Sequence, residues 1–488
     1  MEKSKNIIVV GSGLSALAGA CYLAQAGNTV SVYEKNNQIG GRLRVLKKDG
    51  FQFDMGPSWY WMPDVFEKFY RDFNHTTSDF YQLDRLDPGY KVFFKDGDSI
   101  SISAHMDRIY EVFEKEEPGS SKYLKRFIKR AEKNYDIAIN DLVYKPGESI
   151  FELVRFKTVV NVNQFFSTIA KDVRKYIKSE KLREILEFPV LFLGAKASNT
   201  PSFYSFMNFA DFGLGTWHPK GGMYQIVNAF VAIAKELGVE FHTQSNVSEI
   251  VVENNQVKGC VINDRLIEAD LVLSGADYHH TEQLLDKNLR QYSESYWDKK
   301  TFAPSSLLFY VGFDCKIEGV EHHNLFFDTD FETHASSIYD HAEWPKDPLF
   351  YANFPSKTDE EFAPEGKDGG FFLIPIAPGL KDSGDNYDYY FDMIINRLEF
   401  QTKQKIRDKV LFREVFSLKD FVKDYNSYKG NAYGMANTLM QTAVLRPNLA
   451  SSKVKNLYFT GQLTVPGPGL PPAIISGKVV SDLILSKN

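Results

Sequence analysis

Cysteine is scarce in this sequence, and long apolar runs are absent. The 488 residues include three cysteines, Cys21, Cys260 and Cys315, which form neither a CxxC pair nor a cluster with metal-ligand spacing. We therefore expect no disulfide framework and no metal site, and a reducing compartment. No run reaches the roughly 18 apolar residues of a membrane-spanning helix. These absences predict a cytoplasmic protein.

A strong excess of charge of either sign is also missing. The 57 Lys+Arg and 63 Asp+Glu residues leave a formal net charge of −6. This balance argues against a nucleic-acid partner, because such proteins neutralise phosphates with an excess of cations. A composition of 25% charged and 43% hydrophobic residues excludes disordered and fibrous architectures. The abundant class is aromatic, at 14%, which by itself indicates a generous core.

The N-terminal segment has the pattern of a dinucleotide-binding βαβ unit. A strand is predicted over 6–10, a helix from Leu14 to near 27, and a second strand over 29–33 that ends at Glu34. A carboxylate at that distance from the glycine turn can accept hydrogen bonds from ribose hydroxyls. Glycines permit the tight turn and the close approach of a pyrophosphate, and a small third residue permits close helix–strand packing. The turn consists of Gly11, Ser12, Gly13, Leu14, Ser15 and Ala16.

NAD and FAD share this fingerprint, and the next segment distinguishes them. Gly40, Gly41 and Arg42 follow the ribose acid closely, which is typical of FAD sites of the glutathione-reductase and amine-oxidase type. We predict FAD as the cofactor, with Lys35 and Leu43 among the binding residues. No second GxGxxG follows a strand elsewhere, so we expect no separate NAD(P)H site. The flavin then needs another electron acceptor, for which a quinone or dioxygen is the candidate.

The order of predicted elements indicates an α/β fold with insertions. We predict a Rossmann-like FAD-binding domain of the glutathione-reductase/amine-oxidase type, an inserted mixed α+β substrate domain, and a helical region that is a candidate for membrane association. The FAD-binding domain is expected from residues 1–58, 216–290 and 446–488, the helical region from 59–215, and the substrate-domain sheet from 291–445. Further strands are expected near 239–243, 247–253, 256–262, 271–274, 307–313, 323–327, 349–354, 370–376 and 456–461.

One predicted helix, over 121–130, is basic and amphipathic. Tyr123, Leu124, Phe127 and Ile128 share one face, and lysines and arginines surround it. Such a helix can lie on an anionic membrane surface. The alternative is a solvated helix that packs on the core through its apolar stripe. The sequence leaves both interpretations open.

The sequence resembles the bacterial and fungal-type phytoene desaturases and related carotenoid desaturases from end to end. Besides the N-terminal motifs, the resemblance depends on Gly-Thr-Trp-His-Pro-Lys-Gly-Gly-Met at 215–223 and on Ser-Gly-Ala-Asp at 274–277. It also includes His-His-Asn-Leu-Phe-Phe at 322–327, Arg446-Pro447 and Pro-Gly-Pro-Gly-Leu-Pro at 466–471. Two departures are Gly275, where relatives usually have Asn, and Gln462.

The resemblance implies a non-covalent FAD enzyme that oxidises C–C single bonds of a long polyene. It places Ser12 and its turn at the pyrophosphate, Glu34 at the ribose and Val247 at the adenine. Further residues expected around the flavin are Gly56, Pro57, Ser58, Trp59, Ala276, Asp277, Gly461, Gln462, Gly469, Leu470 and Pro471. The substrate would be a carotenoid drawn from the bilayer, so peripheral association with the membrane surface is expected.

Desaturation needs a hydride acceptor, which flavin supplies, and benefits from a base that takes the remaining proton. The candidates for catalysis are Glu152 and Arg155, three residues apart beside aromatic residues. An ordinary i,i+3 ion pair on a helix surface is the alternative. The aromatic stretches 59–61 and 203–206 are candidates for lining an apolar tunnel, with core packing as the alternative.

The departures and the tryptophan-rich stretch lead us to expect a later-step enzyme. This would carry out 3,4-desaturation of a 1-hydroxylated acyclic or γ-type carotenoid. The alternatives are a phytoene desaturase that makes lycopene or neurosporene, a carotenoid cis-trans isomerase, and a flavin amine oxidase.

Overall fold

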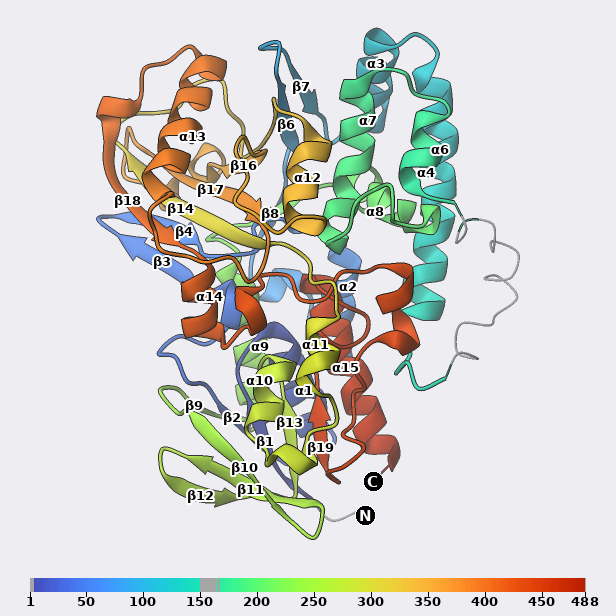
Figure 1. The fold of residues 1–488 in the computed structure, drawn as a ribbon, viewed down its shortest axis with the longest axis vertical. Coiled ribbons are helices and arrows are strands. Elements are labelled where there is room, and N and C mark those ends of the chain that lie inside the picture. The colour runs from blue at the N-terminus through green and yellow to red at the C-terminus, as the bar shows by residue number, and fades with distance from the viewer. Residues whose placement is uncertain (1–3, 150–163, 165–166, 488) are drawn as a thin grey trace.

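The computed structural model describes residues 4–149, 164 and 167–487 (Figure 1). Both ends of the chain lie in the lower part of Figure 1, beside a parallel sheet. A second sheet stands above it on the left, and a layer of helices stands above it on the right. The predicted α/β class is confirmed.

The lower sheet has five parallel strands in the order β19-β13-β1-β2-β9. Strand β1 is central, and its residues from Ile7 to Val10 are buried, as expected for a strand covered on both faces. Helix α1 packs against α9 and α15. The elements are β1 (Asn6–Val10), α1 (Leu14–Gln25), β2 (Thr29–Tyr33), α9 (Tyr224–Glu236), β9 (Glu240–His242), β13 (Leu271–Ser274), β19 (Leu457–Phe459) and α15 (Leu470–Lys487).

A small antiparallel sheet extends this part of the molecule. It consists of β10 (Val247–Glu253), β11 (Gln256–Ile262) and β12 (Arg265–Glu268). The bounds predicted for β1, β2, β10, β11 and β13 match the structure. These strands are short apolar runs bounded by turn residues, so local sequence suffices to define them.

The upper sheet has seven strands in the order β18-β14-β17-β16-β15-β6-β7. Its neighbours are antiparallel except for β15 and β6, which are parallel. The strands are β6 (Tyr90–Phe94), β7 (Ser99–Ile102), β14 (Ser305–Phe313), β15 (His323–Phe327), β16 (Phe350–Asn353), β17 (Asp368–Ile376) and β18 (Val410–Phe416). Strands β6 and β7 correct the expectation that 59–215 is helical. Because β6 pairs with a strand more than 200 residues away, no local pattern reveals its place.

The helical layer contains α3 (Met106–Glu116), α4 (Ser120–Ile137), α6 (Ile169–Arg174), α7 (Glu180–Glu187) and α8 (Phe206–Asn208). Helix α4 contains the basic amphipathic stretch. Its stripe of Tyr123, Leu124, Phe127 and Ile128 is buried, so the apolar face packs on the core and the charged residues, most of them basic, face outward. Helix α7 begins after Ser179, whose hydroxyl accepts a hydrogen bond from the N–H of Leu182.

The remaining helices and strands connect these layers. Within the described residues, no helix has both the length and the hydrophobicity needed to cross a membrane. The connecting elements are β3 (Val45–Lys48), β4 (Phe51–Asp54), α2 (Pro63–Asp72), β5 (Leu83–Arg85), β8 (Trp217–Pro219), α10 (Tyr278–Gln283), α11 (Glu294–Asp298), α12 (Phe331–Tyr339), α13 (Tyr387–Thr402) and α14 (Leu418–Tyr425).

Candidate active site

A cavity of about 830 Å³ lies where the three parts of the molecule meet. Its wall includes the predicted dinucleotide turn, side chains of the upper sheet and residues of the helical layer. All predicted cofactor residues except Ala16 line it: Gly11, Ser12, Gly13, Leu14, Ser15, Glu34, Lys35, Gly40, Gly41, Arg42, Leu43, Gly56, Pro57, Ser58, Trp59, Val247, Ala276, Asp277, Gly461, Gln462, Gly469, Leu470 and Pro471. Glu152 and Arg155 lie outside the described residues.

Glu34 organises the turn at the end of the first strand. One of its oxygens accepts from the N–H and the hydroxyl of Ser12, at 3.0 and 2.7 Å. The other accepts from the N–H and the amide of Asn36, at 2.9 and 3.0 Å. A carboxylate has about four lone-pair sites, and the protein already uses all four. Glu34 therefore holds the turn in shape. Its contact with a ribose stays a prediction, and a ribose hydroxyl would have to share a carboxylate oxygen with Ser12 or Asn36.

The glycines of the two predicted cofactor segments approach each other closely. Gly40 donates its N–H to the Ser12 carbonyl oxygen at 3.1 Å, and a Cβ on Gly41 would lie 3.1 Å from the Gly13 Cα. By contrast, a Cβ on Gly13 would have no protein atom within 4 Å. The space above Gly13 is therefore open at the N-terminus of α1, where backbone N–H groups favour an anion such as a diphosphate.

Arg42 makes no ion pair with a carboxylate among the described residues, although Asp277 is close enough to interact with its charge. Its guanidinium donates to the Ser427 hydroxyl and to the Asn431 carbonyl oxygen, at 3.2 and 3.3 Å. It also lies 5.0 Å from the ring centre of Tyr425. Its Nε is buried and makes no hydrogen bond within the described structure. Burial lowers the pKa of Arg42. A buried cation with a free donor on the cavity wall fits a diphosphate group.

The two departures from the family pattern have structural explanations. A Cβ on Gly275 would lie 2.6 Å from the Cβ of Ala16, so glycine here permits α1 to approach β13. Gln462 contacts the arginine: with its amide oxygen turned inward, it accepts from Arg42 at 3.1 Å and donates to the Ala432 carbonyl oxygen at 3.2 Å. Gly275 therefore affects packing, and Gln462 orients Arg42.

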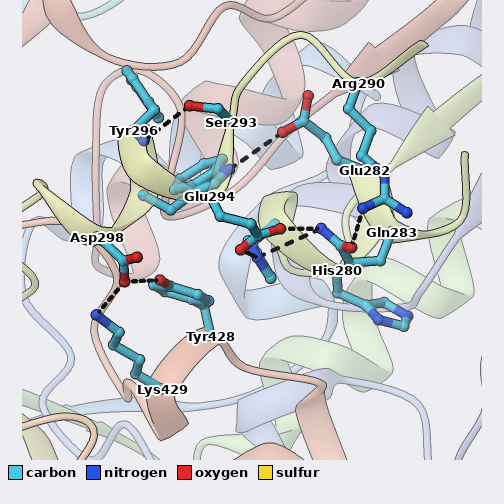
Figure 2. Close-up of polar contacts among 12 residues, drawn as sticks. His280, Glu282, Gln283, Arg290, Ser293, Glu294, Tyr296, Asp298, Tyr428 and Lys429 are labelled. Carbon is cyan, nitrogen blue, oxygen red and sulfur yellow. Dashed lines mark hydrogen bonds and ion pairs between the residues drawn. The ribbon is translucent and has the colours of Figure 1, made fainter. Parts of the chain in front are cut away.

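A polar network fixes the cavity wall near α10. Asp277 begins this helix, and its oxygens accept from the N–H groups of His280 and Tyr428, each at 3.3 Å. Asp298 on α11 binds the Tyr428 hydroxyl at 2.8 Å (Figure 2). Figure 2 also shows Glu294 bound to Gln283 of α10. Burial raises the pKa of Asp277 and lowers that of His280 to about 4. The network thus holds α10 and the segment around Tyr428 together beside the cavity.

The other side of the cavity is apolar. Trp59 stacks on His323, with ring centres 4.2 Å apart and planes within 11°. It also contacts the rings of Tyr90, Phe188 and Tyr351, at 5.5 to 5.6 Å. Apolar side chains from both the sheet and the helices complete this chamber: Leu191, Phe203, Phe206, Leu308, Leu325, Phe327, Leu349, Phe371 and Leu373. Both aromatic stretches singled out in the sequence thus contribute to the wall, since Trp59, Trp61, Phe203, Tyr204 and Phe206 line the cavity.

Sequence reasoning missed one polar group of the chamber. Tyr351 on β16 lines the cavity, and its hydroxyl lies between the Ser58 hydroxyl and the His323 ring, at 2.8 and 2.6 Å. The sequence predicts Ser58 as a cofactor residue and marks His323 only as part of a family motif. No local signal marks Tyr351, because it meets Ser58 across 293 residues of chain.

The family model for flavin containing amine oxidoreductases matches residues 12–485. The chain belongs to this family. A carotenoid 3,4-desaturase from Haloarcula japonica is 40% identical over 485 residues, which cover 99% of this chain and 98% of that protein. A zeta-carotene-forming phytoene desaturase from Myxococcus xanthus is 30% identical, with 99% and 94% covered. These relatives confirm the resemblance to the phytoene desaturase-type proteins.

A solved oxidoreductase from Methanosarcina mazei shares the fold, with a TM-score of 0.64, 18% identity, and 99% and 100% of the two chains covered. Family membership confirms FAD as the cofactor and an FAD-dependent oxidoreductase as the class of enzyme. The open space above Gly13 and the buried Arg42 fit its diphosphate. The roles of the individual cofactor residues stay predictions.

Proposed function

We propose that the protein is an FAD-dependent carotenoid desaturase that introduces a 3,4-double bond into a 1-hydroxylated acyclic or γ-type carotenoid. The observation that carries the proposal is the composition of the cavity wall. A single cavity is lined by the dinucleotide turn on one side and by an aromatic and aliphatic chamber on the other. A long hydrocarbon bound in the chamber would therefore lie next to the cofactor.

The chemistry depends on position more than on charge. Bound FAD supplies a two-electron acceptor for a hydride. The substrate has no charged group near the reacting bond, so the chamber must align it through its shape. The flat rings around Trp59 and the branched side chains of Leu308 and Leu373 suit a rigid polyene, and they exclude water from it.

A hydroxylated substrate is favoured over phytoene by two observations. The relative named as a 3,4-desaturase is 40% identical, whereas the phytoene desaturase from Myxococcus xanthus is 30% identical. The chamber wall also contains hydroxyl groups: Ser306 on β14 lies beside Tyr433, and Tyr339 of α12 faces the same cavity. A substrate hydroxyl could pair with these groups, which a pure hydrocarbon could not do.

An amine substrate has less support. The carboxylates among the described lining residues are Glu34, Asp277 and Asp424, and all three lie on the dinucleotide side of the cavity. A cage for an ammonium group would need negative charge or open ring faces within the chamber.

The test uses purified holoenzyme in lipid vesicles with three separate substrates: a 1-hydroxylated acyclic carotenoid, lycopene and phytoene. We expect the hydroxylated carotenoid to gain one conjugated double bond, which shifts its absorption spectrum to longer wavelength. Phytoene should remain unconverted. Conversion of phytoene alone would contradict 3,4-desaturation. Unchanged conjugation with an altered cis/trans ratio would identify an isomerase.

We also propose that the enzyme works at the membrane surface and passes its electrons to a quinone or dioxygen. The support for membrane attachment is a basic patch formed by exposed residues: Lys122, Lys125 and Lys129 of α4, Lys171 of α6, and Lys175, which directly follows α6. Within it, the half-exposed Tyr176 stacks on Tyr123, with ring centres 4.9 Å apart. Because the apolar stripe of α4 is buried, attachment would be electrostatic, with Tyr176 at the interface.

Charge reversal tests this attachment. We expect Lys122→Glu, Lys125→Glu and Lys129→Glu together to weaken binding to anionic vesicles, since each basic residue near such a surface contributes about 1 kcal/mol. The matched control is Lys258→Glu with Arg265→Glu, on the small sheet of the FAD-binding part. Equal binding of both variants to the vesicles would contradict a role for the basic patch.

The electron acceptor is tested by turnover without oxygen. Anaerobic turnover should require added quinone, and a requirement for NAD(P)+ would contradict our proposal.

A further inference from the structure

A chain of three buried polar groups leads from the cavity into the upper sheet. The Ser58 hydroxyl lies 2.8 Å from the Tyr351 hydroxyl, which lies 2.6 Å from Nδ1 of His323. Ser58 follows β4, Tyr351 belongs to β16 and His323 to β15. Ser58 and Tyr351 line the cavity, and His323 is fully buried behind them. The chain is therefore open to the cavity at one end only.

Asn353 defines the direction of these hydrogen bonds. Its amide nitrogen donates to the His322 carbonyl oxygen at 3.0 Å and also faces Nδ1 of His323 at 3.3 Å. An amide nitrogen donates only, so Nδ1 is an acceptor. The Tyr351 hydroxyl then donates to Nδ1, and its oxygen accepts from Ser58. The lone pairs of the Ser58 oxygen remain available toward the cavity.

The surroundings of His323 keep the ring neutral. It lies between Trp59, on which it stacks, and His322, whose ring centre is 4.4 Å away. Burial, with a smaller contribution from His218, holds the pKa of His323 well below its usual range. A neutral ring keeps a lone pair on Nδ1, which accepts the hydrogen bond from the Tyr351 hydroxyl and can take up that proton. Its Nε2 makes no hydrogen bond within the described residues, so no carboxylate there competes for the proton.

We propose that Ser58, Tyr351 and His323 form a relay that takes up the proton released during desaturation; this inference rests on the proposed function. Bound FAD would supply the acceptor for a hydride, and thus for two electrons, from one substrate carbon. The C–H bond of the neighbouring carbon breaks, and its electron pair forms the new double bond. The proton moves to the Ser58 oxygen while the Ser58 proton moves to Tyr351 and the Tyr351 proton to Nδ1.

His323 would hold the proton on Nδ1 after the double bond has formed. The balancing acceptor for this proton and for the two electrons held by FAD would be a quinone or dioxygen. A weak base suffices, because a C–H bond next to a carbocation is strongly acidic. An uncharged relay also keeps the chamber suitable for a hydrocarbon, since an ionised base facing it would be costly to bury.

Tyr351→Phe tests the relay because it removes one hydroxyl and keeps the ring. With the 1-hydroxylated carotenoid under anaerobic conditions, we expect flavin reduction to slow about 100-fold, in the range of a lost general base. FAD content, the apoprotein melting temperature and carotenoid affinity should remain at wild-type values. Reduction of the wild-type enzyme should also be slower in D2O than in H2O, and the variant should lose this difference.

Further variants separate the relay from a structural role. Ser58→Ala should resemble Tyr351→Phe, whereas Ser58→Thr should retain most of the rate because it keeps a hydroxyl. The matched control is Tyr60→Phe, which removes a buried hydroxyl 3.0 Å from that of Tyr81, away from the relay.

Two outcomes would overturn the relay. One is a wild-type rate and isotope effect in Tyr351→Phe and in Ser58→Ala. The other is an effect that is not specific to the relay: an equal loss of rate in the Tyr60→Phe control, or a loss of FAD or of thermal stability in both relay variants. A wild-type enzyme whose flavin is not reduced by any carotenoid would instead contradict the proposed function, so the two failures are distinguishable.

Discussion

Gly275 lies against Ala16 so closely that a Cβ on Gly275 would be 2.6 Å from the Cβ of Ala16. We therefore expect Gly275→Ala to destabilise the protein by about 1–3 kcal/mol, the usual cost of overpacking. Denaturation in urea measures this loss. Because the steric conflict involves one methyl group, Ala16→Gly should relieve it in the double variant, with a coupling energy of about 1 kcal/mol or more. Additive effects of the two substitutions would show that the contact is not the cause.

Ser12 should contribute to FAD binding through the shape of the turn. Its hydroxyl donates to Glu34 at 2.7 Å and accepts from the Gly40 N–H at 3.2 Å, which ties the two cofactor segments together. Ser12→Ala removes a hydrogen bond to a charged group, worth about 1.5 kcal/mol. We expect roughly tenfold weaker FAD binding, measured by flavin fluorescence. The exposed Ser101 provides the control, and an equal effect of Ser101→Ala would contradict this role.

Arg42 and Arg44 should respond differently to the same substitution. Arg44 forms an ion pair with Asp424, whereas Arg42 has no such partner among the described residues. Arg44→Met leaves a carboxylate without its cation, so we expect a loss of about 2 kcal/mol in apoprotein stability. Arg42→Met removes a buried charge, so the apoprotein should keep its stability while FAD content falls strongly. The measurements are the flavin-to-protein ratio and apoprotein melting. Normal FAD content in Arg42→Met would contradict the assigned site.

His334 should make the folded state sensitive to acid. Its Nε2 donates to the Pro375 carbonyl oxygen at 2.8 Å, and its Nδ1 accepts from the Leu349 N–H at 3.1 Å, so the folded state holds a neutral ring. Burial lowers its pKa from 6.5 to about 4. The unfolded chain binds the proton more readily, so stability is present above pH 6.5 and falls as the pH drops toward 4, by about 3 kcal/mol.

The variant His334→Gln lacks this titration. Urea denaturation of both proteins between pH 4 and 7 should show the wild type losing more stability than the variant as the pH falls. The exposed His341 is the control, since His341→Gln should leave the acid dependence of the wild type in place. A wild-type dependence in His334→Gln would contradict the assignment.

The amino-acid sequence by itself determined the dinucleotide-binding part. Strand β1, the Gly11–Ala16 turn, α1 and Glu34 are consecutive, and the backbone requirements of a tight turn and a close phosphate approach limit which residues can stand there. The strand bounds of β10, β11 and β13 were predictable for the same reason, since each is a local apolar run between turn residues. Family motifs further along the chain extended these predictions to the cavity wall.

The tertiary structure alone decided what lies opposite that turn. The β6–β7 pair meets the rest of the upper sheet through β15, more than 200 residues away. The buried stripe of α4 shows that the apolar face of this helix packs on the core. The Ser58–Tyr351–His323 chain and the Gly275–Ala16 contact likewise join residues far apart in sequence. Such contacts form because whole layers pack against one another, and no spacing along the chain encodes which side chains then meet.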